Sequence, residues 1–80
     1  MEIRLIAFGI ARDIIAGSTL KVHMKEGDTI ANLKSHLVSI FPEFKKLAHL
    51  EFAMKEEYVS DETILNVSDE VIIIPPVSGG

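Results

Sequence analysis

The sequence predicts an α+β domain in which one main helix packs across a mixed sheet of about five strands. Short runs of alternating apolar and polar residues stand near the start of the chain, and a run of branched apolar residues stands near its end. Between them lies a long segment whose apolar residues recur with the spacing of a helix. With 80 residues and no internal repeat, the chain is expected to form one domain with a single core.

The N-terminal part is expected to form two strands joined by a short helical segment. Residues 2–8 (EIRLIAF) alternate at first and then become apolar, so they predict a strand that is buried on both faces toward its end. Residues 10–17 (IARDIIAG) predict a short helical turn that ends at Gly17. Residues 18–25 (STLKVHMK) alternate again and predict a half-buried second strand, antiparallel to the first. The apolar side of this strand is formed by Leu20, Val22 and Met24.

The main helix is expected to begin at Asp28 or Thr29, since both residues are favourable N-caps. The residues that follow place their apolar side chains on one stripe, which the helix would turn toward the sheet. This stripe comprises Ile30, Leu33, Leu37, Ile40 and Phe41. Pro42 ends or kinks the helix, and residues 43–49 (EFKKLAH) are expected to add another turn.

The C-terminal part predicts three further strands. Residues 50–54 (LEFAM) and 58–59 (YV) flank a turn at 55–57 and are expected to form a hairpin. Residues 60–69 are expected to be a loop with a single helical turn. The last strand spans 70–74, and its unbroken apolar run predicts a central strand covered on both faces.

Charge and composition exclude several classes of protein. The net charge of −4 argues against a nucleic-acid-binding protein, which needs a basic surface. The chain has no cysteine, which excludes disulfides, thiolate metal sites and a cysteine nucleophile. No segment has the length of a membrane span or the pattern of a signal peptide, so a cytoplasmic protein without membrane contact is expected.

The last residues predict an extended tail that leaves the domain. Pro75 and Pro76 cannot donate to a sheet, so we expect the folded domain to span 1–74 and a flexible tail to span 75–80. Fully extended, such a tail reaches roughly 20 Å, and glycine at its last two positions would let it enter a narrow channel. A frayed terminus without function is the alternative interpretation. A carboxylate at Gly80 would need activation by another enzyme before it could react.

The closing segment carries a resemblance to a known family. Asp69-Glu70-Val71 and then Pro75-Pro76-Val77-Ser78-Gly79-Gly80, together with AFGIARDI at 7–14, make the chain similar to the small subunit of molybdopterin synthase. This is the sulfur-carrier branch of the ubiquitin-like β-grasp fold. The chain departs from the family's usual turns at Lys55-Glu56 and at Val67-Ser68-Asp69.

The resemblance implies a cycle of sulfur transfer centred on Gly80. An E1-like activating enzyme would use ATP to adenylate Gly80, and sulfur would then replace AMP to leave a thiocarboxylate. The tail, Pro75, Pro76, Val77, Ser78 and Gly79, would enter a channel in the synthase large subunit, within a heterotetramer. Sulfur would pass there to a cyclic pterin phosphate and form the dithiolene of molybdopterin. This chain would bind no cofactor and would be inactive alone, because catalytic side chains would belong to its partners.

A docking surface beside the tail is expected to include Phe8, Tyr58 and Ile74, since the family uses apolar positions of this kind. Each of them is equally compatible with the core. His23, His36 and His49 lie on different predicted elements and are expected to be surface residues, so no metal site is predicted.

Three other functions remain open from the sequence. One is a ubiquitin-like modifier that is attached to lysines through Gly80. Another is a sulfur carrier for thiamin synthesis or tRNA thiolation. The third is a structural binding module, for which Gly79 and Gly80 would be dispensable.

Overall fold

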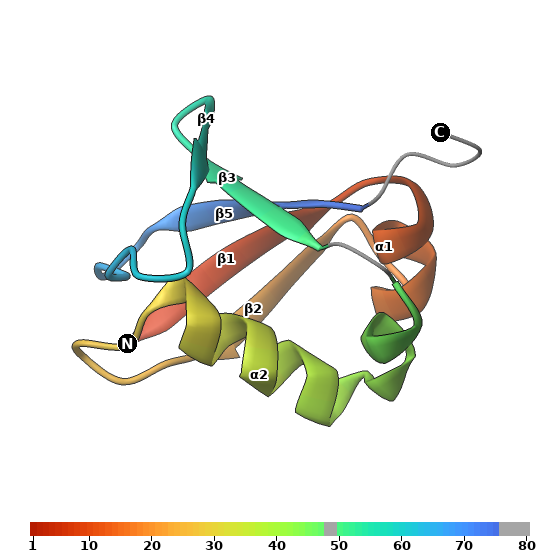
Figure 1. The fold of residues 1–80 in the computed structure, drawn as a ribbon, viewed down its shortest axis with the longest axis horizontal. Helices are drawn as coiled ribbons and strands as arrows, with labels where there is room; N and C mark the ends of the chain where they lie inside the picture. Colours follow the sequence, from red (N-terminus) through yellow and green to blue (C-terminus); the bar gives the residue numbers. More distant parts are fainter. Residues whose placement is uncertain (48–49, 76–80) are drawn as a thin grey trace.

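The computed structural model describes residues 1–47 and 50–75. They form a five-stranded mixed sheet with the strand order β2-β1-β5-β3-β4, and α2 packs across one of its faces (Figure 1). The elements are β1 (Glu2–Ala7), α1 (Gly9–Ile15), β2 (Thr19–His23), α2 (Ile30–Ile40), the 3-10 helix η1 (Pro42–Lys46), β3 (Glu51–Met54), β4 (Glu57–Val59) and β5 (Glu70–Ile74). The α+β class, the five strands and the single main helix are as predicted.

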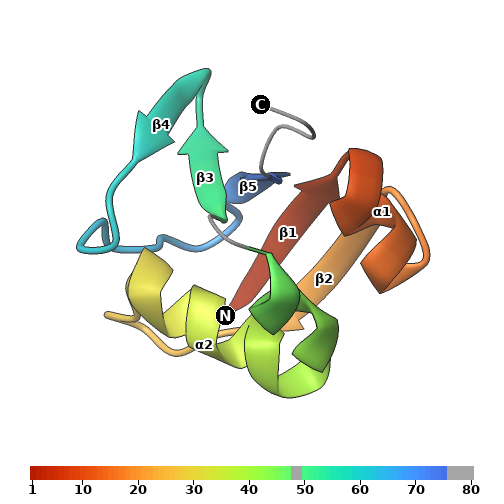
Figure 2. The same ribbon diagram turned by 45° about the vertical axis from the view of Figure 1, so that its right-hand side comes forward.

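The central position of β5 confirms the interpretation of its unbroken apolar run. This strand pairs in parallel with β1 and antiparallel with β3, while β1 and β2 are antiparallel as expected. The expectation that β5 is covered on both faces was wrong. Val71 and Ile73 are buried beneath α2, but Ile72 and Ile74 are only half-buried, because no described helix covers the other face (Figure 2).

The same correction applies to the end of β1. The strand stops at Ala7 rather than Phe8, and Ile6 on its outer side is half-buried while Leu5 and Ala7 are fully buried. An apolar side chain therefore occurs on each face of β1, yet only one of these faces belongs to the core.

Helix α2 begins as predicted, with Thr29 as its N-cap. Ile30, Leu33 and Leu37 are fully buried against the sheet. Ile40, which also belongs to the predicted stripe, is 47% exposed, and it is the last residue of the helix. Phe41 turns inward in its place.

The 3-10 helix η1 follows α2 and overlaps residues 43–49, where a further turn is expected from the sequence, but it begins one residue earlier, at Pro42. The ring of Phe41 packs edge-on against Phe44, with 6.1 Å between ring centroids. Phe44 itself is almost fully buried, so this aromatic pair continues the core beyond the end of α2.

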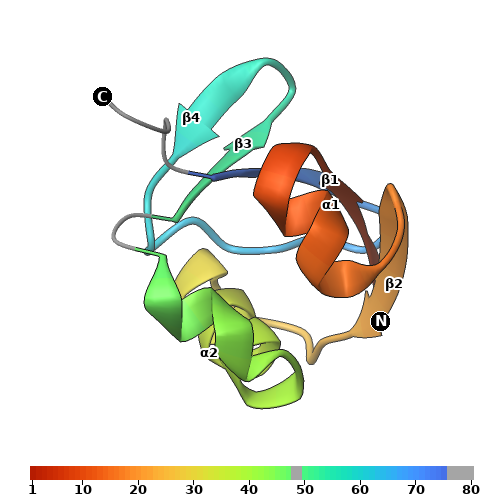
Figure 3. The same ribbon diagram turned by 90° about the vertical axis from the view of Figure 1, so that its right-hand side faces the viewer.

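The first helix, α1, starts earlier and ends earlier than predicted. Its C-cap is Ala16 in the left-handed conformation rather than Gly17. Ala11 and Ile15 are buried, and they hold α1 at the end of the sheet where β5 finishes (Figure 3).

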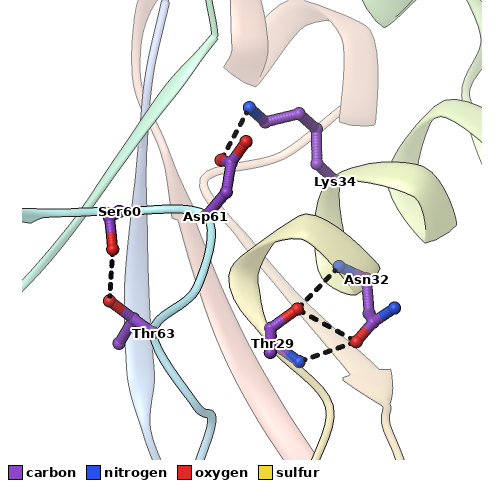
Figure 4. Close-up of polar contacts among 6 residues, drawn as sticks. All are labelled: Thr29, Asn32, Lys34, Ser60, Asp61 and Thr63. Carbon is purple, nitrogen blue, oxygen red and sulfur yellow. Dashed lines mark hydrogen bonds and ion pairs between the residues drawn. The ribbon is translucent and has the colours of Figure 1, made fainter.

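Residues 60–69 form a loop, as expected, but they contain turns and an isolated bridge instead of the predicted helical turn. The loop bonds to the start of α2: the Ile30 amide donates to the Thr63 carbonyl at 2.9 Å, and the Leu65 amide donates to the Asp28 carbonyl at 2.8 Å. A salt bridge between Lys34 and Asp61 adds to this contact (Figure 4). The Leu65 amide thus finds its acceptor in another segment, and the amides of Thr63, Asn66 and Asp69 find theirs in the turns of the loop, so no helical turn is needed to satisfy them.

One apolar cluster forms the core between α2 and the sheet. Its members come from every helix and from all strands except β4, and Leu65 is contributed by the loop before β5. The helices in the described part of the chain are too short and too polar to cross a membrane.

Candidate functional site

The outer face of the sheet, opposite α2, presents one row of side chains that crosses all five strands. The pairings place Thr19, Ile6, Ile72, Ala53 and Tyr58 side by side in this row. These residues alternate with the core residues of the same strands, so they lie on the face that the helices leave open. Tyr58 is 67% exposed, whereas Ala53 is buried beside it.

Toward the end of β5 this face is mainly apolar, with the exposed Glu51 of β3 beside Ile74. Ile74 lies two residues beyond Ile72 and pairs with Glu51 of β3, while Phe8 follows Ile6 by two residues and is 57% exposed. We call Ile6, Phe8, Tyr58, Ile72 and Ile74 the apolar patch. Pro75 follows Ile74 directly and is half-buried, so the patch lies beside the end of β5.

Toward the start of β5 the same face is charged. Arg4 contacts Glu70 at 3.5 Å, and Lys21 contacts Glu2 at 4.0 Å. Both pairs are exposed and contribute little to stability. They neutralise one another, so the charged half presents no strong field of one sign. A partner that recognises the outer face therefore finds its apolar contacts next to the tail.

The structure brings the three predicted docking residues onto or beside one surface. Phe8 and Tyr58 are too exposed to be core residues, and Ile74 is half-buried at the edge of the tail. That they contact a partner stays a prediction. The remaining predicted site residues, Pro76, Val77, Ser78, Gly79 and Gly80, lie outside the described residues.

Sequence reasoning missed Ile6 and Ile72. A period of two running back from Phe8 and from Ile74 leads to these two residues. This period did not indicate an open face, because four consecutive branched residues in β5 predict a strand covered on both faces. An uncovered face that serves as an interface has the same apolar composition.

His23 and His36 lie away from the apolar patch. His23 on β2 and His36 on α2 line one surface cavity together with Asp28, and His49 lies outside the described residues. In residues 1–47 and 50–75, no three histidine, aspartate or glutamate side chains come close enough to hold a metal ion.

A cavity of about 760 Å³ opens between α2, η1 and the β3–β4 hairpin. Its floor contains Val38, Phe44 and Phe52, and the ion pair of Lys34 and Asp61 stands at its rim. It lies on the helix side of the sheet and is therefore separated from the apolar patch.

Comparison with known proteins places this geometry in a family. The ThiS family profile matches residues 5–80. The molybdopterin synthase sulfur carrier subunit of Arabidopsis thaliana is 35% identical over 81 residues, which cover 100% of this chain and 84% of that protein.

Solved structures confirm the predicted ubiquitin-like β-grasp fold. SAMP1 from Haloferax volcanii superposes with a TM-score of 0.84 at 19% identity and covers 100% of both chains. A ubiquitin from Caldiarchaeum subterraneum superposes with a TM-score of 0.68 at 18% identity, covering 100% of this chain and 98% of that one. The profile match extends over nearly the whole chain, and the chain belongs to the ThiS family.

Proposed function

We propose that this protein is the sulfur-carrier small subunit of a molybdopterin synthase. The observation that carries the proposal is the full-length similarity to a molybdopterin synthase sulfur carrier subunit, joined to a sequence that closes with Pro-Pro-Val-Ser-Gly-Gly. The apolar patch around Pro75 supports it, because a carrier must dock on its partners where its tail begins.

The chemistry would take place on the carboxyl group of Gly80. An E1-like partner would join this carboxylate to AMP, using ATP and releasing pyrophosphate. A sulfur nucleophile would then attack the carbonyl carbon, and AMP would leave with one of the original oxygens. The resulting thiocarboxylate would give its sulfur to a cyclic pterin phosphate, and hydrolysis of the acyl group would restore the carboxylate.

The tail and the apolar patch would have separate tasks in this cycle. Six residues from Pro75 onward span roughly 20 Å when extended, which is enough to carry Gly80 into a partner's active site. The apolar patch would hold the domain at the entrance of that site. Exposed aromatic residues at the centre of an interface commonly contribute most of its binding energy, which points to Phe8 and Tyr58 as the main contacts.

The proposal is tested by preparing the protein with a thiocarboxylate at Gly80 and mixing it with a molybdopterin synthase large subunit and the cyclic pterin phosphate. The dithiolene product is expected to form as the thiocarboxylate is consumed. The same protein with an ordinary carboxylate is the matched control and is expected to give no product. A thiocarboxylate that persists in this mixture, yet is consumed by enzymes of thiazole synthesis or tRNA thiolation, would contradict the proposal.

Mass spectrometry of cell extracts distinguishes a carrier from a protein modifier. If the chain is conjugated to other proteins, tryptic proteolysis should yield lysines that carry residues 56–80 of this chain, because Lys55 is its last basic residue. The proposal predicts that its main product in the cell is free protein with a carboxylate or thiocarboxylate at Gly80.

A further inference from the structure

We propose that the loop before β5 carries a second docking surface, which binds a basic segment of a partner protein through Ile64 and Val67. Figure 1 shows this loop and the N-terminus at one end of the sheet and α1 at the other. The surface is separate from the apolar patch, which lies at the other end of β5, roughly 13 Å along the strand. A partner bound at the loop therefore leaves the apolar patch uncovered.

Two large apolar side chains of the loop face solvent, although the residue beside them is held in the core. Ile64 is 58% exposed and Val67 is 70% exposed, the highest values among the large aliphatic residues that the structure describes. Leu65 between them is 2% exposed. A single exposed apolar residue is ordinary, but neighbouring ones on one surface mark a place where another molecule binds.

Ile64 and Val67 line one cavity, which has a volume of about 540 Å³. Its other walls include Met1 at the start of the chain and Glu26 and Gly27 in the turn between β2 and α2. The volume lies within the roughly 300–1,000 Å³ of pockets that hold a bound ligand. The cavity can therefore receive apolar side chains of a partner.

Hydrogen bonds to neighbouring segments hold the loop in this form. The Leu65 amide donates to the Asp28 carbonyl at 2.8 Å, and the Arg4 amide donates to the Asp69 carbonyl at 3.1 Å. Within the loop, the Asn66 amide donates to the Asp69 carboxylate at 2.6 Å. A surface that is already in place loses little conformational entropy when a partner binds to it.

The distribution of charge indicates the chemistry of that partner. All eight lysine and arginine residues lie in residues 1–55. Residues 56–75 contain no basic residue and six acidic ones, Glu56, Glu57, Asp61, Glu62, Asp69 and Glu70. At the surface itself, Glu26 lines the cavity and Glu62 precedes Ile64 by two residues, and neither forms an ion pair with a residue that the structure describes. Lysine or arginine beside apolar side chains would match this surface.

The cations nearest to the loop do not cancel this charge. Arg4 is paired with Glu70 and Lys34 is paired with Asp61. A second copy of the chain is a poor occupant, because a two-fold contact would bring Glu26 and Glu62 of both copies together.

An NMR titration of the full chain with a synthetic amphipathic peptide of lysine and leucine tests the surface. The backbone amide signals of Ile64 and Val67 should shift, and those of Phe8 and Tyr58 should not. Ile64→Ser and Val67→Ser should each weaken peptide binding about tenfold, because each removes an aliphatic contact that binding buries. Glu62→Gln should weaken it about two- to fivefold.

Ile40→Ser and Glu43→Gln are the matched controls, since both residues are exposed and lie at or just beyond the other end of α2. Neither should change the affinity, and thermal unfolding of each variant shows whether the fold is retained. A peptide with glutamate in place of lysine should not bind.

An equal loss in Ile40→Ser, or equal binding of the glutamate peptide, would overturn the inference. Sedimentation of the chain alone tests the other occupant. A dimer that Val67→Ser abolishes would assign a second copy to the surface and would make the assignment of a basic partner wrong.

Discussion

Several residues of this chain have backbone conformations that glycine or asparagine would adopt more easily. The residues other than glycine with positive φ in the described part of the chain are Ala16, Lys55, Glu56 and Ser68. Three of them fall in the turns where the sequence departs from the usual pattern of its family, and each such conformation costs about 1–2 kcal/mol for a residue with a β-carbon. These departures are thus expected to lower stability without affecting the tail.

The β3–β4 turn allows a direct test at this scale. Lys55 and Glu56 have φ values of 51° and 67° between two antiparallel strands, which corresponds to the hairpin turn that prefers Asn-Gly. The double variant Lys55→Asn, Glu56→Gly should raise the free energy of unfolding by about 1–2 kcal/mol. Urea denaturation measures this change.

The control for this prediction is Glu62→Gly. Glu62 is exposed and does not have a positive φ, so the same substitution should not stabilise the protein there. Equal gains at both sites would show that the conformation of the turn is not the cause.

At the scale of the elements, α2 depends on its first turn. The Thr29 hydroxyl accepts a hydrogen bond from the backbone N–H of Asn32 at 3.4 Å. The side-chain oxygen of Asn32 accepts one from the backbone N–H of Thr29 at 2.9 Å (Figure 4). This reciprocal cap satisfies backbone donors that the helix itself cannot satisfy.

Thr29→Ala should therefore lower the free energy of unfolding by about 1 kcal/mol. Ser39→Ala, at an exposed position near the end of the same helix, serves as the control and should change stability by no more than about 0.5 kcal/mol. Chemical denaturation of both variants decides whether the cap is responsible.

Two residues of α2 that are three positions apart are expected to differ strongly in their contribution to the free energy of unfolding. Leu37 is fully buried and Ile40 is 47% exposed. Leu37→Ala should cost about 2–5 kcal/mol, because it leaves a cavity in the core. Ile40→Ala should cost about 1 kcal/mol or less. Similar losses for both variants would mean that Ile40 belongs to the core as the helical stripe predicted.

Sequence periodicity predicted the elements because each strand and α2 must bury one side. The unbroken apolar run of residues 71–74 predicted the central position of β5. It could not predict that Ile72 and Ile74 are left half-buried, because the composition of a face does not show whether this chain or a partner covers it. Sequence periodicity also did not predict the C-cap at Ala16 or the conformation of residues 60–69, where hydrogen bonds to the start of α2 replace a helical turn.

At the scale of the whole molecule, the outer face of the sheet has two distinct ends. The charged pairs Arg4–Glu70 and Lys21–Glu2 lie where β5 begins, and the apolar patch lies where it ends. The tail stays a prediction from its sequence motif, and three of the five patch residues were predicted from the resemblance to the family. The remaining two became apparent only when the register of the strands placed them in the same row.

The contrast between the two ends of the outer face predicts that partners bind at the apolar patch. Tyr58→Ala and Phe8→Ala should each weaken the binding of a molybdopterin synthase large subunit about tenfold or more. Val67→Ala is the matched control, since Val67 is 70% exposed in the loop that precedes β5. Isothermal calorimetry measures the affinity of each variant. A loss of affinity in Val67→Ala equal to that in Tyr58→Ala or Phe8→Ala would contradict the proposed docking surface.

The central claim is that Gly80 carries sulfur as a thiocarboxylate, and mass spectrometry of the intact protein tests it most directly. The chain is incubated with its activating enzyme, ATP and a sulfur donor, and a variant without Gly79 and Gly80 is treated in parallel. The account predicts a mass gain equal to the replacement of one oxygen by sulfur, located at Gly80 and absent from the shortened variant. An unchanged mass in the full-length chain, under conditions in which the enzyme consumes ATP, would contradict it.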